Sequence, residues 1–114
     1  MDFEQARHNM VEQQIRTWDV LDQNVLDSIS AIPRDGFVPE GYRNLAYSDT
    51  SIPLGYGEKM MTPKLEARIV QTLNLALSDR ILEIGTGSGY LTALLAHLGG
   101  HVTSVEILPG LLEI

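Results

Sequence analysis

The sequence predicts an α/β fold, and residues 79–107 carry most of that prediction. A short apolar run over 81–84 reads as a strand, and three glycines within 85–89 follow it directly. From 90 to 98 apolar residues recur every three or four positions, as on one face of a helix. A second apolar run over 101–107 predicts another strand. Strand, glycine turn, helix and strand form a βαβ unit, the building block of a Rossmann-like fold.

Two helices are predicted upstream of this unit. Residues 2–16 place apolar side chains on one broad face, which predicts an amphipathic helix. Asp22 is expected to cap a second helix that ends before Pro33, because the residue preceding proline disfavours the helical conformation. Trp18, between the two helices, is expected to be a core or helix-packing residue. The apolar face of the first helix consists of Phe3, Ala6, Met10, Val11 and Ile15.

A long irregular segment and a third helix are expected next. Residues 33–62 are rich in Pro, Gly, Asp and Ser, and such long segments are usually functional or disordered. Thr62 and Pro63 then suit the N-cap and first position of a helix. Gly99-Gly100 is expected to end the helix of the βαβ unit in the left-handed conformation. The core face of the third helix is predicted to be Leu65, Ile69, Val70 and Leu73.

The glycine turn predicts a ligand site. Glycine adopts positive φ angles without a steric penalty and lets a ligand lie against the backbone. Free N–H groups at the start of the following helix hold a carboxylate or phosphate, and Glu106, ending the second strand, suits the hydroxyls of a ribose. The dinucleotide fingerprint needs its third glycine one residue later, where Tyr90 stands. The pattern from Glu83 to Gly89 instead resembles S-adenosylmethionine-dependent methyltransferases, while an NAD-type site and a purely structural turn remain alternatives.

Composition limits the classes of function. The 114 residues, 44% of them hydrophobic, suffice for one small domain, and the absence of cysteine excludes disulfides and thiolate metal sites. No metal site is expected, since the three histidines have no ligand spacing. The net charge of −7 without a basic cluster argues against nucleic-acid binding, and no apolar run is long enough for a membrane helix. We expect a cytoplasmic protein without nucleic-acid or membrane partners; the oligomeric state stays open.

The length predicts an incomplete domain. A doubly wound sheet needs several parallel strands with helices on both faces, and the sequence supplies one βαβ unit. We expect N-terminal helices and a substrate-side loop over 1–62 and the first part of a cofactor-binding domain over 63–114, together one truncated Rossmann-like domain. By itself such a chain is expected to bind cofactor weakly or not at all, to lack methyltransferase activity and to associate through exposed apolar strands.

The run 32–75, followed by the glycine unit over 79–98, resembles the protein-L-isoaspartate O-methyltransferases, and the resemblance covers most of residues 5–110. The resemblance implies transfer of a methyl group from S-adenosylmethionine to the free carboxylate of isoaspartyl residues in damaged peptides or proteins. It also implies a seven-stranded Rossmann-like sheet, of which this chain holds a part. The residues that carry it are Pro33-Arg34, Phe37-Val38-Pro39, Ala46-Tyr47 with Asp49, Ile52-Pro53-Leu54-Gly55-Tyr56-Gly57, Pro63 and Tyr90.

The resemblance assigns cofactor residues and exposes one departure. Glu83 would lie near the cofactor's amino group, or be a strand-end acid held by backbone N–H groups, and Ile107 would pack on the adenine or in the core. Met61 stands where the family has its active-site serine, which leaves Thr62 as the candidate catalytic residue. The alternatives are an inactive relative that only binds cofactor or a partner, and a methyltransferase acting on a small molecule or RNA. The matched cofactor residues are Gly85, Thr86, Gly87, Ser88, Gly89 and Glu106.

Overall fold

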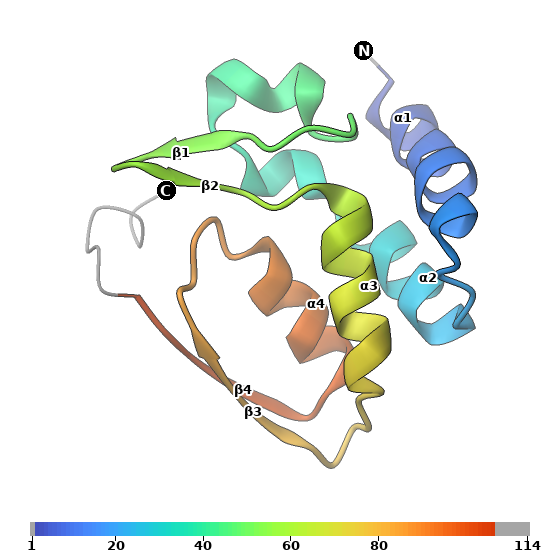
Figure 1. The fold of residues 1–114 in the computed structure, drawn as a ribbon, viewed down its shortest axis with the longest axis vertical. Helices are drawn as coiled ribbons and strands as arrows, with labels where there is room; N and C mark the ends of the chain where they lie inside the picture. The colour runs from blue at the N-terminus through green and yellow to red at the C-terminus, as the bar shows by residue number, and fades with distance from the viewer. Residues whose placement is uncertain (1, 107–114) are drawn as a thin grey trace.

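The structure, a computed structural model, describes residues 2–106. In Figure 1 the N-terminal helices lie on one side of α3, and α4 lies between α3 and the β3–β4 pair. Among the described residues, no helix is long and apolar enough to cross a membrane. The helices are α1 (Phe3–Met10), α2 (Gln23–Ala31), α3 (Pro63–Leu73) and α4 (Tyr90–Leu98), and the strands are β1 (Pro53–Gly55), β2 (Glu58–Lys59), β3 (Arg80–Ile84) and β4 (His101–Val105).

The predicted first helix is confirmed, with a change of pitch in its second half. After α1 the chain continues as a π-helix over Val11–Ile15 and a 3₁₀ turn over Arg16–Trp18. Its predicted apolar side chains are buried or packed against the core. The expected core role of Trp18 is wrong: the residue is 45% exposed, and Lys64 Nζ lies 4.2 Å from its ring centroid. The ammonium group covers an aromatic face that the core leaves uncovered.

The second helix is confirmed at both ends. Asp22 Oδ1 accepts a hydrogen bond from the backbone N–H of Asn24 at 2.9 Å, so the predicted cap is made. The helix ends at Ala31, and Ile32, the residue before Pro33, is extended with φ −95° and ψ 119°. Val25, Leu26 and Ile29 are buried in the core.

The third helix begins where predicted but buries a different face. Thr62 occupies the N-cap position of α3, and its side chain makes no capping hydrogen bond. The buried residues are Pro63, Glu66, Ala67 and Val70, whereas Leu65 and Leu73 are 44% and 52% exposed. The predicted face was wrong at these two leucines because a carboxylate, Glu66, is turned inward by a buried partner described below.

The segment 33–62 is more ordered than its composition predicts. Two 3₁₀ turns cover Arg34–Phe37 and Glu40–Leu45, and β1 pairs with β2 in a short antiparallel hairpin. The hairpin turns at Tyr56 and Gly57, with φ of 55° and 77°. It lies above the segment that follows β3 in Figure 1, and a Cβ on Gly87 would lie 3.6 Å from Leu54 Cδ1 of β1.

The βαβ unit is confirmed. β3 and β4 are parallel, with Arg80 opposite His101 and Ile84 opposite Val105. One face of this pair packs on the core through Ile81 and Val102, next to α4. The other face is bare: its large apolar side chains are Leu82, Ile84 and Val105, which are 65%, 77% and 47% exposed.

The conformation predicted for Gly99-Gly100 is wrong. Gly99 is extended, with φ −99° and ψ −172°, rather than left-handed. A Cβ on Gly100 would lie 2.0 Å from the carbonyl oxygen of Leu77, and the N–H of Gly100 donates to Asp79 O at 3.1 Å. Gly100 therefore allows two backbone segments to approach closely, which is a tertiary requirement and not a property of the helix end.

Candidate functional site

The glycine turn adopts the backbone conformation that its sequence predicts. Gly85, Gly87 and Gly89 have φ of +91°, +57° and +87°, a region that residues with a Cβ rarely adopt. Gly89 is the N-cap of α4, and the N–H of Gly85 donates to Val105 O at 2.7 Å. The turn therefore leaves β3, stays bonded to the end of β4 and enters α4 within a few residues.

Glu106 reaches this turn from the end of β4. Its Oε1 accepts a hydrogen bond from the N–H of Gly87 at 2.9 Å, and the residue is half-buried. The glycine turn and the acid that follows β4 therefore meet. Their meeting follows from the parallel pairing of β3 and β4, whose carboxyl ends lie at the same edge.

Glu83 is buried beneath the turn, with 8% of its surface exposed. Its Oε1 accepts hydrogen bonds from Ser104 Oγ at 2.7 Å and from Thr92 Oγ1. Because Ser104 gives its proton to Glu83, Thr86 Oγ1 donates to Ser104 Oγ at 2.5 Å. The expectation that backbone N–H groups hold this acid is therefore corrected: side-chain hydroxyls hold it. The one feature of the sequence that indicates this arrangement is Ser104, a polar residue at an inward position of β4.

A small hollow brings the segment before α3 and the glycine turn together. It has a volume of about 70 Å³ and contains both Met61 and the glycine turn in its wall. Thr62, the candidate catalytic residue, is half-buried at the N-cap of α3 and is not among the described residues that line it. Ile107 lies outside the described residues. The lining residues are Leu54, Met60, Met61, Glu66, Glu83, Gly85, Thr86, Gly87, Ser88 and Leu91.

A buried ion pair that the sequence did not predict lies next to the hollow. Arg34 Nη1 donates to Glu66 Oε1, and Arg34 Nη2 donates to Met61 O at 3.0 Å. The guanidinium also lies over the ring of Tyr90, 4.7 Å from its centroid. Burial raises the pKa of Glu66 to about 7, against the opposing effect of Arg34, and Glu83 raises it further. Burial also raises the pKa of Tyr90 above its usual 10.0. The local sequence pattern carries no sign of this pairing.

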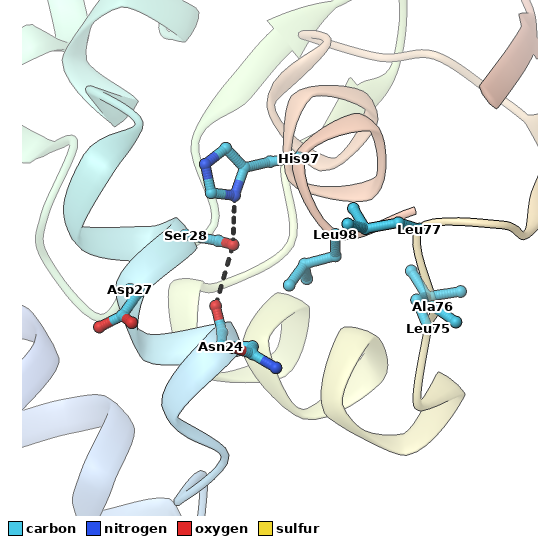
Figure 2. Close-up of a pocket in the computed structure, with 8 residues that line it drawn as sticks. All are labelled: Asn24, Asp27, Ser28, Leu75, Ala76, Leu77, His97 and Leu98. Carbon is cyan, nitrogen blue, oxygen red and sulfur yellow. Dashed lines mark hydrogen bonds between the residues drawn. The ribbon is translucent and has the colours of Figure 1, made fainter. Parts of the chain in front are cut away.

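A larger pocket lies at the opposite end of α4, between α2 and the segment before β3 (Figure 2). Its volume is about 340 Å³. His97 Nδ1 lies 2.6 Å from Ser28 Oγ, and Ser28 Oγ donates to Asn24 O at 3.0 Å. Since the serine proton is already used, His97 is the donor in this pair, and the serine is not activated as a nucleophile. None of the sequence-predicted site residues lines this pocket.

Comparison with known proteins identifies the family. The sequence model of the protein-L-isoaspartate(D-aspartate) O-methyltransferase family matches residues 5–114. The chain belongs to this family. A protein-L-isoaspartate O-methyltransferase of Serratia proteamaculans is 47% identical over 98 residues, covering 86% of this chain and 47% of the relative. A second such enzyme, from an Anaeromyxobacter species, is 43% identical over 108 residues, covering 95% of this chain and 44% of the relative. The chain thus spans about half the length of the curated relatives it matches.

Solved structures show that the predicted α/β methyltransferase fold is correct. One protein-L-isoaspartate O-methyltransferase structure matches with a TM-score of 0.73 and 27% identity, covering 95% of this chain and 36% of that protein. A second, from Plasmodium falciparum, was solved in complex with S-adenosyl-L-homocysteine and matches with a TM-score of 0.72 and 19% identity. It covers 99% of this chain and 52% of that protein, and it supports the fold alone.

Proposed function

We propose that this chain forms the cofactor-binding half of a protein-L-isoaspartate O-methyltransferase and binds S-adenosylmethionine. The observation that carries the proposal is the glycine turn flanked by two acids, Glu83 beneath it and Glu106 bonded to it. Glu106 is placed to accept hydrogen bonds from ribose hydroxyls, and the buried carboxylate of Glu83 suits the cofactor's ammonium group. When bound, S-adenosylmethionine supplies an electrophilic methyl group. The family's name, which is that of an O-methyltransferase, supports a methyl-donating cofactor.

The position of Tyr90 argues against a dinucleotide. The dinucleotide fingerprint requires a small residue there for close packing of helix and strand. Tyr90 is 2% exposed and packs edge-on against Phe37, with ring centroids 5.8 Å apart. The helix start is thus fixed by a large aromatic residue.

We further propose that the acceptor is the free carboxylate of an isoaspartyl residue in a damaged protein. A carboxylate is already an anion at neutral pH, so the reaction needs little acid–base assistance. The protein then acts mainly by holding the carboxylate oxygen in line with the methyl group. A protein substrate and a cytoplasmic location agree with the acidic net charge of −7, which disfavours nucleic acid and anionic membranes.

Calorimetric titration with S-adenosylhomocysteine and with NAD tests the cofactor assignment. The protein used should be this chain joined to the C-terminal half of the Serratia proteamaculans relative, because the match covers 47% of that relative. S-adenosylhomocysteine should bind more tightly than NAD. Glu106→Ala should weaken its binding by roughly 1.5–3 kcal/mol, since a charged acceptor is lost. The matched control is Glu58→Ala, an exposed acid of the hairpin, which should leave the affinity unchanged. Tighter binding of NAD would overturn the assignment.

The alternative function is a relative that binds cofactor without transferring a methyl group, and the position of Met61 favours it. Met61 lines the hollow, and its thioether cannot donate a hydrogen bond to a substrate carboxylate. If the methyltransferase function holds, Met61→Ser in the joined protein should raise the methyl-transfer rate on isoaspartyl peptide by about ten- to a hundred-fold, because one donor to a charged group is restored.

A methyl-transfer assay with isoaspartyl and ordinary aspartyl peptides makes this measurement. Leu21→Ser, an exposed site outside the hollow, is the control for the substitution itself. If neither version methylates isoaspartyl peptide while S-adenosylhomocysteine still binds, the repair function fails, and the alternatives are another methyl acceptor or cofactor binding without methyl transfer.

A further inference from the structure

Arg34 is fully buried, which is rare for an arginine and requires partners for its charge. Its side chain contacts three separate segments. Nη1 reaches Glu66 on α3, Nη2 reaches the carbonyl oxygen of Met61 just before α3, and the guanidinium covers the ring of Tyr90 in the first turn of α4. Arg34 itself begins the 3₁₀ turn Arg34–Phe37.

These segments form the two sides of the candidate site. Met61 and Gly85 line the same hollow, and Tyr90 directly follows Gly89, the last residue of the glycine turn. The side chain of Arg34 therefore bonds to the segment expected to meet the methyl acceptor. Through the ring of Tyr90 it also contacts the segment expected to hold the cofactor. The guanidinium of Arg34 donates two hydrogen bonds. Only the bond to Met61 O acts directly on the backbone of the segment expected to meet the methyl acceptor.

Stability alone does not explain this arrangement. Replacing a buried ion pair by apolar side chains of similar volume is often neutral or stabilising. The planar guanidinium offers donors at fixed positions, whereas the ammonium of lysine is a single point of charge. The guanidinium thus fixes a geometry: in a single orientation it donates to both Glu66 and Met61 O and lies over the ring of Tyr90.

We propose that Arg34 is a positioning residue that fixes the acceptor-side segment 60–62 against the glycine turn 85–89. The proposal rests on the methyltransferase function proposed above and adds a residue that acts through the backbone of Met61. In-line methyl transfer depends on sub-ångström placement of the two reactants, so loosening this contact lowers the rate without removing either binding site.

Hydrogen exchange of the Met60 amide in the 114-residue chain tests the contact directly. This N–H donates to Ile52 O at 2.8 Å, next to the residue that Arg34 holds. In Arg34→Lys and Arg34→Met the amide should exchange about ten-fold faster, because the bond to Met61 O is lost. In Glu66→Gln it should stay within about two-fold, because the amide oxygen still accepts from Nη1 and Nη2 still reaches Met61 O.

The control is Arg16→Met, which removes an arginine from an exposed pair with Glu12, where the side chains are 40% and 43% exposed. It should leave the Met60 amide unchanged. Urea unfolding identifies variants that remain folded, and Arg34→Lys with Glu66→Gln decides the question if Arg34→Met does not fold. Wild-type exchange in Arg34→Lys would overturn the proposal. So would equal acceleration in Arg34→Lys and Glu66→Gln, because that result assigns the effect to the ion pair.

Kinetics of the joined protein separate this inference from the function on which it rests. Arg34→Lys should lower kcat about ten- to a hundred-fold while changing the Kd for S-adenosylhomocysteine less than about two-fold. An equal loss in kcat and in cofactor affinity would mean a general structural defect and would overturn the positioning role. Absence of methyl transfer by the unmutated joined protein would instead overturn the proposed function, and the exchange experiment would still decide whether Arg34 holds Met61.

Discussion

Glu66 lies in an environment far from that of a free side chain. It is 3% exposed, pairs with Arg34 and faces Glu83 and Tyr90. Burial raises its pKa from the usual 4.5 to about 7 even though Arg34 opposes the shift. The carboxyl therefore changes charge within the physiological range of pH, in the wall of the hollow.

This shift predicts a pH dependence of folding. The folded chain binds the Glu66 proton more tightly than the unfolded chain, so the free energy of unfolding contributed by this group falls as the pH rises from 4.5 to about 7. Between pH 5 and pH 7.5 the loss should be on the order of 2 kcal/mol. Glu66→Gln should remove it.

Urea unfolding of both chains at the two pH values makes the comparison. The quantity is the difference between wild type and variant, because other groups also titrate. Asp27→Asn, at an exposed site on α2, is the control and should keep the wild-type slope. Parallel pH profiles for wild type and Glu66→Gln would contradict the raised pKa.

At the scale of elements, three features were predicted correctly from neighbouring residues alone. The Asp22 cap, the stop before Pro33 and the helix from Tyr90 to Leu98 each depend on a local motif or period. The meeting of Glu106 with Gly87 was also predictable, because parallel pairing places both at one edge.

Features that depend on partners far apart in the sequence could not be predicted from local motifs. Arg34 turns Glu66 inward across 32 positions of sequence and thereby sets the buried face of α3. The hydroxyls that hold Glu83 come from α4 and β4, on Thr92 and Ser104. In each case a polar side chain occupies an inward position whose partner lies on another element.

The close approach at Gly100 gives a prediction for the start of β4. A Cβ there would lie 2.0 Å from Leu77 O, which is backbone and cannot rotate away. Gly100→Ala should lower the free energy of unfolding by roughly 1–3 kcal/mol, the usual range for overpacking. Gly41→Ala, where no atom lies within 4 Å of the added Cβ, is the matched control and should change stability little. Urea denaturation measures both. Equal stability of the two variants would mean that the Leu77–Asp79 segment moves freely.

At the scale of the whole molecule, α4 covers one face of the β3–β4 pair, and the other face is bare. Leu82 and Ile84 are 65% and 77% exposed on that bare face. Contiguous exposed apolar side chains on an open sheet favour association. The described part of this chain is thus a folded core with one unprotected side.

Gel filtration at several concentrations should show the 114-residue chain as an oligomer or aggregate. The double substitution Leu82→Lys with Ile84→Lys should move it toward the monomer, because charged side chains oppose pairing of the bare faces. Leu21→Lys, an equally exposed leucine before α2, is the control and should not change the elution. A wild-type monomer at all concentrations, with cooperative melting, would contradict the prediction.

The bare face also affects which fluorescence signal is suited to following the unfolding of this chain. Fluorescent dyes that brighten on apolar surface usually report unfolding, because the native state of most proteins offers them little to bind. Here Leu82, Ile84 and Val105 present such surface in the folded monomer. A dye-based thermal scan would therefore begin bright, and its rise would be shallow or absent. Trp18 is the only tryptophan of the chain and lies against Lys64, so its intrinsic emission reports loss of the native packing without that background.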